Sequence, residues 1–243
     1  MKIKTSPLTL EKSYLLNPSV KHFVFSCQDE KINQFIPGQF ITMHFDIDGK
    51  VLKRSYSIAN RTNNQRIEFA AGFVPEGPAT EKLFNLAPGD SIEVNGPFGR
   101  LVLKDESPKR YIFIATSTGV TPYRAMLNEF ANRLTQNSGL EIHILLGVRT
   151  REELLYQEEF LDFAASHPSA HFHACYSREQ AAELEQFEHK GYVQTLLTKL
   201  NPDPQGDIVY LCGNPSMVDA CHELLTQHEF ELKNIRREKY ISR

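Results

Sequence analysis

The sequence predicts a fold in two parts, an antiparallel β-barrel followed by a doubly wound sheet of parallel strands and helices. Short runs rich in β-branched and aromatic residues fill the first part, and turn signals such as Pro37-Gly38 and Asp48-Gly49 separate them. Closely spaced strands of this kind are typical of small antiparallel barrels. After residue 104, strand-like and helix-like segments alternate, which indicates parallel strands joined by right-handed crossovers. We therefore expect two domains, residues 1–104 and 105–243.

The expected elements follow in order along each part. In the first part, turn residues bound the strands and one short helix interrupts them. The strands cover 22–26, 40–45, 51–58, 66–71 and 91–94, and the helix covers 79–86. In the second part, the apolar run 111–115 is continuous, as in a strand buried on both faces. The other strands cover 141–148, 170–176 and 208–212, and the helices cover 122–134, 152–165, 193–200 and 216–228.

Composition argues against several classes of protein. The net charge of −3 disfavours a general nucleic-acid binder, which carries a basic excess. The first residues contain no apolar leader, and no apolar run approaches the ~20 residues that span a bilayer. The four cysteines are scattered without a CxxC pair, so neither an iron–sulfur cluster nor a structural zinc site is indicated. His171 and His173 share a strand face but lack an evident third metal ligand, so we expect them to be packing or surface histidines. From the absence of an apolar leader or spanning run we expect a cytoplasmic protein.

The segment Arg54-Ser55-Tyr56-Ser57 ends an expected strand and combines a cation, an aromatic ring and hydroxyl groups. These groups suit a flavin dinucleotide, which offers a charged pyrophosphate, a flat ring and a reactive edge that takes a hydrogen bond. Farther on, Gly77-Pro78-Ala79-Thr80 opens the short helix, where glycine allows close backbone approach and free N–H groups favour a phosphate. The alternatives are a plain strand and an ordinary helix start with proline in its first turn.

Two further segments follow buried strands of the second part. The loop 116–122 opens a helix at the place where doubly wound sheets bind nucleotides, with hydroxyls from Thr118 and Thr121 and a single glycine, Gly119. Cys212-Gly213 ends another strand and is expected to face the same crevice. An uneventful turn and a buried cysteine acting as a small hydrophobe are the alternatives.

Polar residues also follow the strand 170–176. Ser177 and Arg178 are suited to clamp a phosphomonoester, and Tyr192 to stack on a purine. Arg149 and Arg151 add positive charge nearby. A solvated, charged loop is the alternative interpretation.

Taken together, the ordered motifs resemble one family. RSYSIA, the GF…GPAT helix start, GPFGRLVL, TSTGVTP, LLGVR, SREQ…GYVQ and LCGNPSMV occur in the order seen in the ferredoxin–NADP⁺ reductase family. The resemblance covers the chain from about Pro37 to its C-terminus. It implies a six-stranded FAD-binding barrel followed by an NADP-binding α/β domain.

The resemblance also implies roles for individual residues. Toward FAD, Arg54 resembles the pyrophosphate contact, Tyr56 the ring packed on the isoalloxazine and Ser57 the hydroxyl near flavin N5. The other implied FAD residues are Ser55, Gly77, Ala79 and Thr80. Toward the nicotinamide nucleotide, the implied residues are Thr118, Gly119, Pro122, Cys212 and Gly213. The implied 2′-phosphate and adenine site, which favours NADPH over NADH, comprises Ser177, Arg178, Tyr192 and Gln194, with Arg149 beside it. Ser57, Cys212 and Glu238 are the expected catalytic residues.

Two positions depart from the family pattern. Ser117 stands where the loop usually has its first glycine. Members often end with an aromatic residue stacked on the flavin, whereas here Tyr240 is followed by Ile241, Ser242 and Arg243. Tyr240 is the expected stacking ring.

The resemblance implies a monomeric flavoenzyme that passes electrons between NADP(H) and a one-electron carrier, a separate ferredoxin or flavodoxin. Hydride would move between nicotinamide C4 and flavin N5. Two rivals remain: an NADH-dependent reductase component of an oxygenase or free-flavin reductase, and a regulatory protein that has lost FAD.

Overall fold

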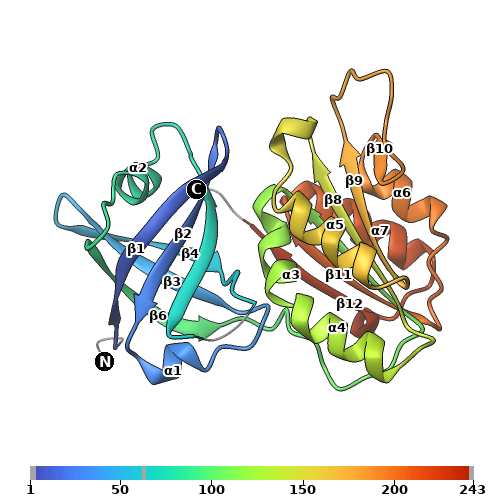
Figure 1. Ribbon diagram of the computed structural model, residues 1–243, viewed down its shortest axis with the longest axis horizontal. Helices are drawn as coiled ribbons and strands as arrows, with labels where there is room; N and C mark the ends of the chain where they lie inside the picture. Colours follow the sequence, from blue (N-terminus) through green and yellow to red (C-terminus); the bar gives the residue numbers. More distant parts are fainter. Residues whose placement is uncertain (1–3, 62–63, 241–243) are drawn as a thin grey trace. The chain divides into compact units, whose positions relative to one another are not determined.

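The computed structural model of the chain describes residues 4–61 and 64–240, which divide into two compact units (Figure 1). The barrel unit comprises Met1–Leu103 together with Thr121–Met126, and the sheet unit comprises Lys104–Val120 together with Leu127–Arg243. Each unit has a six-stranded sheet and a hydrophobic core of its own.

The barrel unit contains an antiparallel sheet with the strand order β4-β3-β6-β1-β2-β5. Its strands are β1 (Ser6–Asn17), β2 (Val20–Cys27), β3 (Phe40–Ile47), β4 (Lys50–Ser57), β5 (Arg66–Gly72) and β6 (Ser91–Phe98), and its helices include α1 (Glu30–Asn33) and α2 (Pro78–Phe84). Apolar residues alternate along β3, so Ile41, Met43 and Phe45 are completely buried. This sheet confirms the antiparallel, six-stranded architecture expected of the first part.

The two edge strands of this sheet are joined just beyond β4. The Ala59 N–H donates to the Glu68 carbonyl on β5 at 2.7 Å. The Asn60 side chain adds two bonds to the same strand: its amide donates to the Arg66 carbonyl and its oxygen accepts from the Glu68 N–H. These bonds bring the sheet edges together at this end, so the last residues of β4 are held from both sides.

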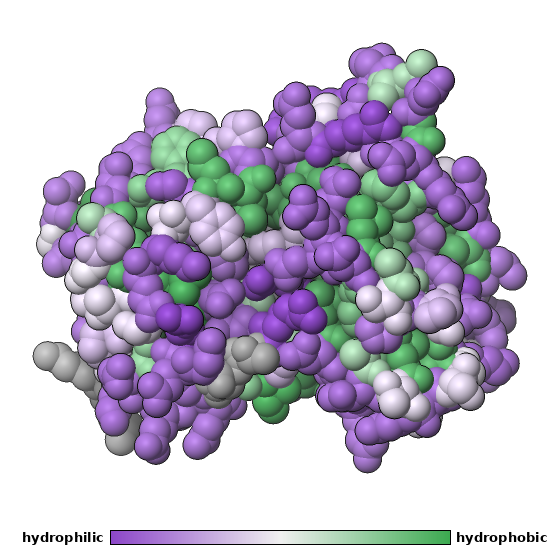
Figure 2. All heavy atoms as spheres, viewed as in Figure 1, coloured by the Kyte–Doolittle hydropathy of each residue, from purple (hydrophilic) through white to green (hydrophobic). Residues whose placement is uncertain are grey.

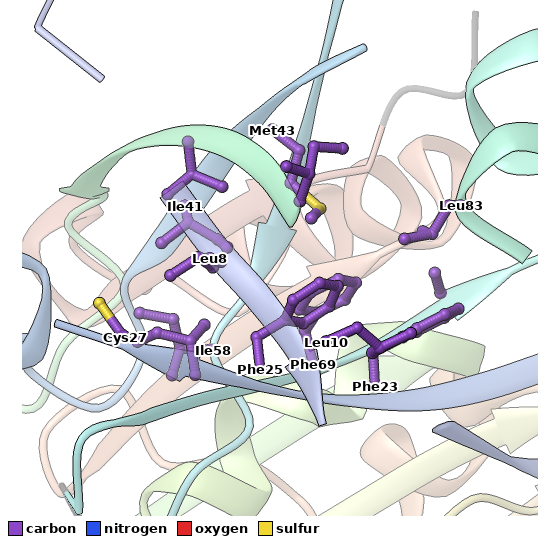
Figure 3. Packing of buried hydrophobic residues seen from close by; sticks show 14 of the residues in the cluster. Leu8, Leu10, Phe23, Phe25, Cys27, Ile41, Met43, Ile58, Phe69 and Leu83 are labelled. Atoms are coloured by element: carbon purple, nitrogen blue, oxygen red, sulfur yellow. The ribbon is translucent and has the colours of Figure 1, made fainter. Parts of the chain in front are cut away.

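Stacked phenylalanines form the centre of the barrel core (Figure 3). The Phe69 ring centroid lies 5.4 Å from that of Phe23 and 5.6 Å from that of Phe25, with interplanar angles of 20° and 9°. Each of these side chains is completely buried, which stabilises the fold by about 1.5–3 kcal/mol per ring. The core therefore provides a rigid wall behind the adjoining strands.

Strand β1 was not expected from the sequence, although it is the longest of the barrel unit. Its pairing with β2 is shifted between Leu10 and Lys12 and again between Leu15 and Asn17. Such bulges break the simple alternation of inward and outward residues by which a strand is recognised. Only its first half shows a regular buried pattern, through Leu8 and Leu10.

The sheet unit contains a parallel sheet with the strand order β10-β9-β8-β7-β11-β12 (Figure 1). Its strands are β7 (Arg110–Thr116), β8 (Glu141–Val148), β9 (Ala170–Tyr176), β10 (Glu188–Lys190), β11 (Asp207–Gly213) and β12 (Ile235–Lys239). Its helical elements are η1 (Ser117–Val120), α4 (Leu127–Gln136), η2 (Arg151–Glu153), α5 (Gln157–Ser166), α6 (Val193–Lys199), α7 (Pro215–Gln227) and η3 (Leu232–Asn234). The expected doubly wound architecture is confirmed.

The strand order reverses between β7 and β11. From β7 the chain runs outward through β8, β9 and β10, and it then returns to β11 on the other side of β7. The helices α6 and α7 pack in one core with Ile112, Ile114 and Leu145. On the opposite face, Phe130 of α4 packs against Phe113 at 4.5 Å between ring centroids. The carboxyl ends of β7 and β11 are thus the point where such folds bind ligands.

Several element boundaries differ from the sequence prediction. The expected helix 122–134 is two helices, α3 (Thr121–Ala125) and α4, which are interrupted at Met126. The expected helix 152–165 begins only at Gln157, because Tyr156 adopts a left-handed φ of 56°. The edge strands β10 and β12 were missed because they are short and carry mostly charged residues. Across the described ranges, no helix is both long and apolar enough to cross a membrane.

Candidate functional site

Strand β4 places Arg54 and Tyr56 on one face and Ser55 on the other. Arg54 and Tyr56 are half-buried, whereas Ser55 is exposed and its Oγ lies 3.1 Å from Thr42 Oγ1. The Tyr56 ring stacks on Phe69 with centroids 4.7 Å apart and an interplanar angle of 23°. Burial raises the pKa of Tyr56 to about 12, against the opposing effect of the Arg54 charge. The strand therefore pairs a cation with a neutral, firmly backed aromatic ring.

Ser57 is the buried end of the same strand, with an exposed fraction of 5%. Its neighbour Ile58 donates its N–H to the Gln39 carbonyl at 2.9 Å, and Ala59 is bonded to β5 as described above. The main chain that follows Ser57 is thus held by hydrogen bonds on both sides.

The loop before α2 is shaped by Thr80 and Gly77. The buried Thr80 hydroxyl accepts from the Val74 N–H at 3.2 Å, and it lies 3.1 Å from the Val74 carbonyl and 3.0 Å from the Gly77 carbonyl. A Cβ atom on Gly77 would approach Thr80 Oγ1 and the Val74 carbonyl to 2.9 Å, so the turn requires glycine. The Thr80 hydroxyl is engaged by its own loop. What the helix start offers outward is main-chain N–H groups of its first turn, which have no partner within a helix.

A second network holds the segment after β4 and was not foreseen. Arg124 of α3 donates to the Ala59 carbonyl at 2.9 Å and to Glu68 Oε2 at 3.1 Å. The completely buried His22 ring lies 3.2 Å from the same carboxylate oxygen. The hydrogen bond from His22 and the charge of Arg124 lower the pKa of Glu68, although burial opposes them. In the sequence, the feature that hints at this network is Glu68, a carboxylate within the largely apolar strand β5.

At the switch point of the parallel sheet, two loops meet through glycine residues. A Cβ atom on Gly119 would lie 2.3 Å from the Cys212 carbonyl oxygen, and one on Gly213 would lie 2.5 Å from Thr116 Oγ1. The Asn214 N–H donates to Thr116 Oγ1 at 2.9 Å and closes the contact. The two loops therefore pack main chain closely against main chain at their meeting point, and Gly119 and Gly213 are both buried there.

The first of these loops accommodates Ser117 in a left-handed conformation. Its φ is 49°, a region that favours glycine and costs other residues roughly 1 kcal/mol. This explains why the family pattern has glycine at that position. Thr118 is half-buried, and Pro122 is buried at the start of α3. Thr121 is also buried, and its hydroxyl has no hydrogen-bond partner within the part of the chain that the structure describes.

Cys212, Glu238 and Tyr240 come together at the end of β11. The parallel register pairs Cys212 with Glu238, and the Tyr240 N–H donates to the Gly213 carbonyl at 2.8 Å. Burial raises the pKa of the Cys212 thiol, the charge of Glu238 raises it further, and a hydrogen bond with Tyr240 opposes the shift. The thiol is completely buried, and a thiol with a raised pKa is a weak nucleophile. Residues 241–243, the departure noted after Tyr240, lie outside the described residues.

The ends of β8 and β9 bring a third group together. The Ser177 N–H donates to the Val148 carbonyl at 3.0 Å, and the Arg178 N–H donates to the Arg149 carbonyl at 2.8 Å. The Gly191 N–H donates to the Tyr176 carbonyl at 2.8 Å, which places Tyr192 beside the same strand end with 69% of its side chain exposed. We call the group of Arg149, Ser177, Arg178, Tyr192 and Gln194 the nucleotide edge. The Gln194 amide oxygen is buried without a hydrogen-bond partner among the described residues.

Arg151, expected to add positive charge at this edge, is neutralised by a residue that the sequence did not single out. Its guanidinium donates to both carboxylate oxygens of Glu188, with Nε to Oε1 at 2.7 Å. Tyr176 donates to the same carboxylate at 2.7 Å. The hydrogen bond from Arg151 lowers the pKa of Glu188 to about 2. This ion pair joins the half-exposed Arg151 to the buried Glu188 and ties the loop after β8 to β10.

Histidines form a ladder across the sheet, beyond the strand face that His171 and His173 share. His143 Nδ1 lies 3.1 Å from His173 Nε2, and His173 Nδ1 lies 3.1 Å from His189 Nε2. Burial lowers the pKa of His143 and of His173 to about 3, so both rings are neutral at neutral pH. In the ranges 4–61 and 64–240, no group of three or more histidine, cysteine, aspartate or glutamate residues is arranged to hold a metal.

Two family models match the chain. The oxidoreductase FAD-binding domain matches residues 7–103, which contain β4 and the loop before α2. The oxidoreductase NAD-binding domain matches residues 113–223, which contain the two switch-point loops and the nucleotide edge.

Individual proteins are similar over most of the chain. Ferredoxin–NADP reductase B of Sorangium cellulosum is 31% identical over 221 residues, which cover 86% of each protein. The toluate 1,2-dioxygenase electron transfer component of Pseudomonas putida is 28% identical over 220 residues, which cover 89% of this chain but 62% of that protein. A solved structure of a ferredoxin NADP⁺ reductase from Neisseria gonorrhoeae, with bound FAD and NADP, matches with a TM-score of 0.84 at 20% identity. It covers 98% of this chain and 99% of that one, a likeness of fold.

Proposed function

This chain belongs to the ferredoxin–NADP reductase family of FAD- and NAD(P)-binding oxidoreductases, and from that premise we propose a specific reaction. The protein passes electrons between NADP(H) and a separate one-electron carrier, a ferredoxin or a flavodoxin. The observation that carries the proposal is the close meeting of the two loops that follow β7 and β11, because it forms the switch point at which doubly wound sheets bind dinucleotides.

The barrel unit supplies residues that fit FAD. Arg54 offers a guanidinium for the pyrophosphate, and Tyr56 offers a ring that Phe69 supports from behind. The turn at Gly77 leaves no room for a side chain, which suits close approach of a phosphate to the helix start. We assign the buried Ser57 hydroxyl to the reactive edge of the flavin.

The sheet unit supplies residues that fit the nicotinamide nucleotide. In our assignment, Thr118, Gly119 and Pro122 hold its phosphates and Cys212 lies beside its nicotinamide ring. The neutral, buried thiol offers a compact apolar surface rather than a reactive group. Glu238 and Tyr240 hold that end of β11, and the nucleotide edge takes the adenosine part.

When bound, the cofactors would supply the redox chemistry, namely hydride transfer between nicotinamide C4 and flavin N5 and single-electron exchange with the carrier. The contribution of the chain is to bind and orient the two rings, which converts an encounter into an effectively unimolecular step. The carrier is assigned to a separate protein because the four cysteines lie in different elements, far from the spacing that a cluster requires.

Steady-state kinetics with NADPH and NADH tests the assignment. We expect a higher kcat/KM with NADPH, and we expect Arg178→Ala to lower the value for NADPH about tenfold while leaving NADH nearly unchanged. NADPH-dependent reduction of ferredoxins and flavodoxins then identifies the carrier class. Equal use of both nucleotides, or an Arg178→Ala variant without effect, would contradict the NADP assignment.

A second candidate is the NADH-dependent reductase component of an oxygenase. The neutralised guanidinium groups of Arg149 and Arg151 favour it, since they weaken the attraction for an extra phosphate. The oxygenase electron transfer component of Pseudomonas putida is similar to this chain but longer. Preference for NADH, together with reduction of an oxygenase in place of a ferredoxin, would support this candidate.

A further inference from the structure

The arginines at and beside the nucleotide edge are accompanied by carboxylates. Arg149, Arg151 and Arg178 supply the positive charges, and Glu153, Glu179 and Glu188 lie in contact with them or with their main chain. In Figure 2 the loop between β9 and β10, at the upper right, is largely hydrophilic. A phosphomonoester carries −1.5 to −2 charges at neutral pH, so this balance is unusual for a site that holds one.

Of these carboxylates, Glu153 is the one that pairs with Arg149, a member of the nucleotide edge. Its Oε1 lies 2.5 Å from Arg149 Nη2, and its Oε2 accepts the Arg149 N–H at 3.0 Å. Although burial opposes the shift, hydrogen bonds from Arg149 and the charge of Arg178 lower the pKa of Glu153. The carboxylate is thus paired with Arg149, whose carbonyl accepts the Arg178 N–H at 2.8 Å, so that the two arginines are held next to each other at this carboxylate.

The other carboxylates are committed to structure. Glu188 is buried between Arg151 and Tyr176, and it also accepts the Glu185 N–H at 2.9 Å. Glu179 accepts the Arg151 and Ala181 N–H groups at 3.0 Å each. Their removal would disturb the loops themselves. Glu153 differs because its main partner, Arg149, keeps 59% of its side chain exposed.

We propose that Glu153 sets the preference between NADPH and NADH by competing with the 2′-phosphate for Arg149. This inference rests on the proposed placement of the adenosine part at the nucleotide edge. A 2′-phosphate would be repelled by the Glu153 carboxylate and would find Arg149 already paired. The neutral 2′-hydroxyl of NADH meets no such repulsion. Glu153 therefore lowers the affinity for NADPH selectively and leaves the affinity for NADH unchanged, which narrows the preference for NADPH without removing it.

The test compares two fragments that differ only in the phosphate, 2′,5′-ADP and 5′-AMP, by calorimetric titration of the FAD-loaded protein. The variant is Glu153→Gln, which keeps an amide oxygen for the Arg149 N–H. Its matched control is Glu152→Gln, the same change of charge one residue away in the exposed turn η2. We expect Glu153→Gln to tighten 2′,5′-ADP about tenfold and to change 5′-AMP less than about twofold. The control should change either fragment by less than about twofold.

The outcomes of this test distinguish a failure of the role of Glu153 from a failure of the proposed placement of the adenosine part at the nucleotide edge. If Arg178→Ala weakens 2′,5′-ADP but Glu153→Gln changes nothing, the placement holds and the role of Glu153 is wrong. Equal tightening of both fragments, or equal effects of the two glutamine variants, also overturns it. If wild-type protein binds neither fragment, or Arg178→Ala has no effect, the placement fails and the inference falls with it. An unchanged melting temperature for Glu153→Gln confirms that the folds compared are the same.

Discussion

The two units present their candidate binding groups in different ways. On β4 of the barrel unit, the proposed recognition rests on the side chains of Arg54 and Tyr56, and the Tyr56 ring stacks on the aromatic core. At the switch point of the sheet unit, the proposed site is built from main chain that meets closely at Gly119 and Gly213. A side-chain surface tolerates conservative replacement as long as its shape survives. A main-chain surface fails as soon as a single methyl group enters it.

Gly119→Ala tests the main-chain surface and should have the largest effect. The new Cβ would meet the Cys212 carbonyl at 2.3 Å, and since both partners are backbone, neither can move aside cheaply. We expect a loss of about 3 kcal/mol in stability and a fall of more than about 100-fold in NADPH-dependent turnover, with bound FAD retained. Gly139→Ala is the control, because its nearest neighbour atom would lie 3.6 Å away. If Gly119→Ala behaves like Gly139→Ala, the two loops are not in contact as described.

Lowering the pH from 7 to 5 should destabilise the sheet unit more than the barrel unit, because the sheet unit contains the histidine ladder. The pKa of His143 and of His173 is lowered by burial to about 3, so an unfolded chain binds protons more readily than the folded sheet unit. The stability that they contribute is present above pH 6.5 and is lost as the pH falls from there toward 3. We expect the sheet unit to lose roughly 2–4 kcal/mol between pH 7 and pH 5. The depressed pKa values of Asp29 and Glu68 affect the barrel unit only below about pH 4.5.

Calorimetric melting at several pH values checks this contrast. His173→Gln should flatten the pH dependence of the sheet transition between pH 7 and pH 5, because the central ring of the ladder is removed. A barrel transition that falls in parallel with the sheet transition over this range would contradict the selective role of the ladder.

Tyr56 variants test the side-chain surface and should show a smaller, graded effect. Tyr56→Phe keeps the ring that stacks on Phe69 and should change FAD affinity less than about threefold. Tyr56→Ala removes the ring and should weaken FAD about tenfold, as measured by fluorescence titration. Equal losses in both variants would mean that the hydroxyl, and not the ring, carries the interaction.

The sequence was most informative where function resides in local chemistry. Both sheets and the segments around Tyr56, Gly119 and Cys212 were predicted because turn residues, apolar runs and motif order are written in neighbouring positions. The Glu188–Arg151 pair and the histidine ladder were not, since their directly contacting partners are up to 37 and 30 residues apart and meet only through strand pairing. The edge strands β10 and β12 were missed for a related reason, because their pairing and not their hydrophobicity defines them.

The role proposed for Glu153 could not be predicted from the sequence either. In the sequence it is one of two adjacent glutamates, and no pattern sets it apart from Glu152. The turn η2 folds its carboxylate back onto Arg149, while Glu152 stays exposed. Side-chain direction within a short turn decides which of the two can influence a bound phosphate.

The central claim is that this chain holds a flavin which NADPH can reduce. The most direct measurement is the visible absorbance of the purified protein, before and after anaerobic addition of NADPH. We predict the absorption of a bound flavin, present as purified or after incubation with FAD, and its bleaching on addition of NADPH. A protein that stays colourless after incubation with FAD, or whose flavin is unchanged by excess NADPH and NADH, would contradict the account.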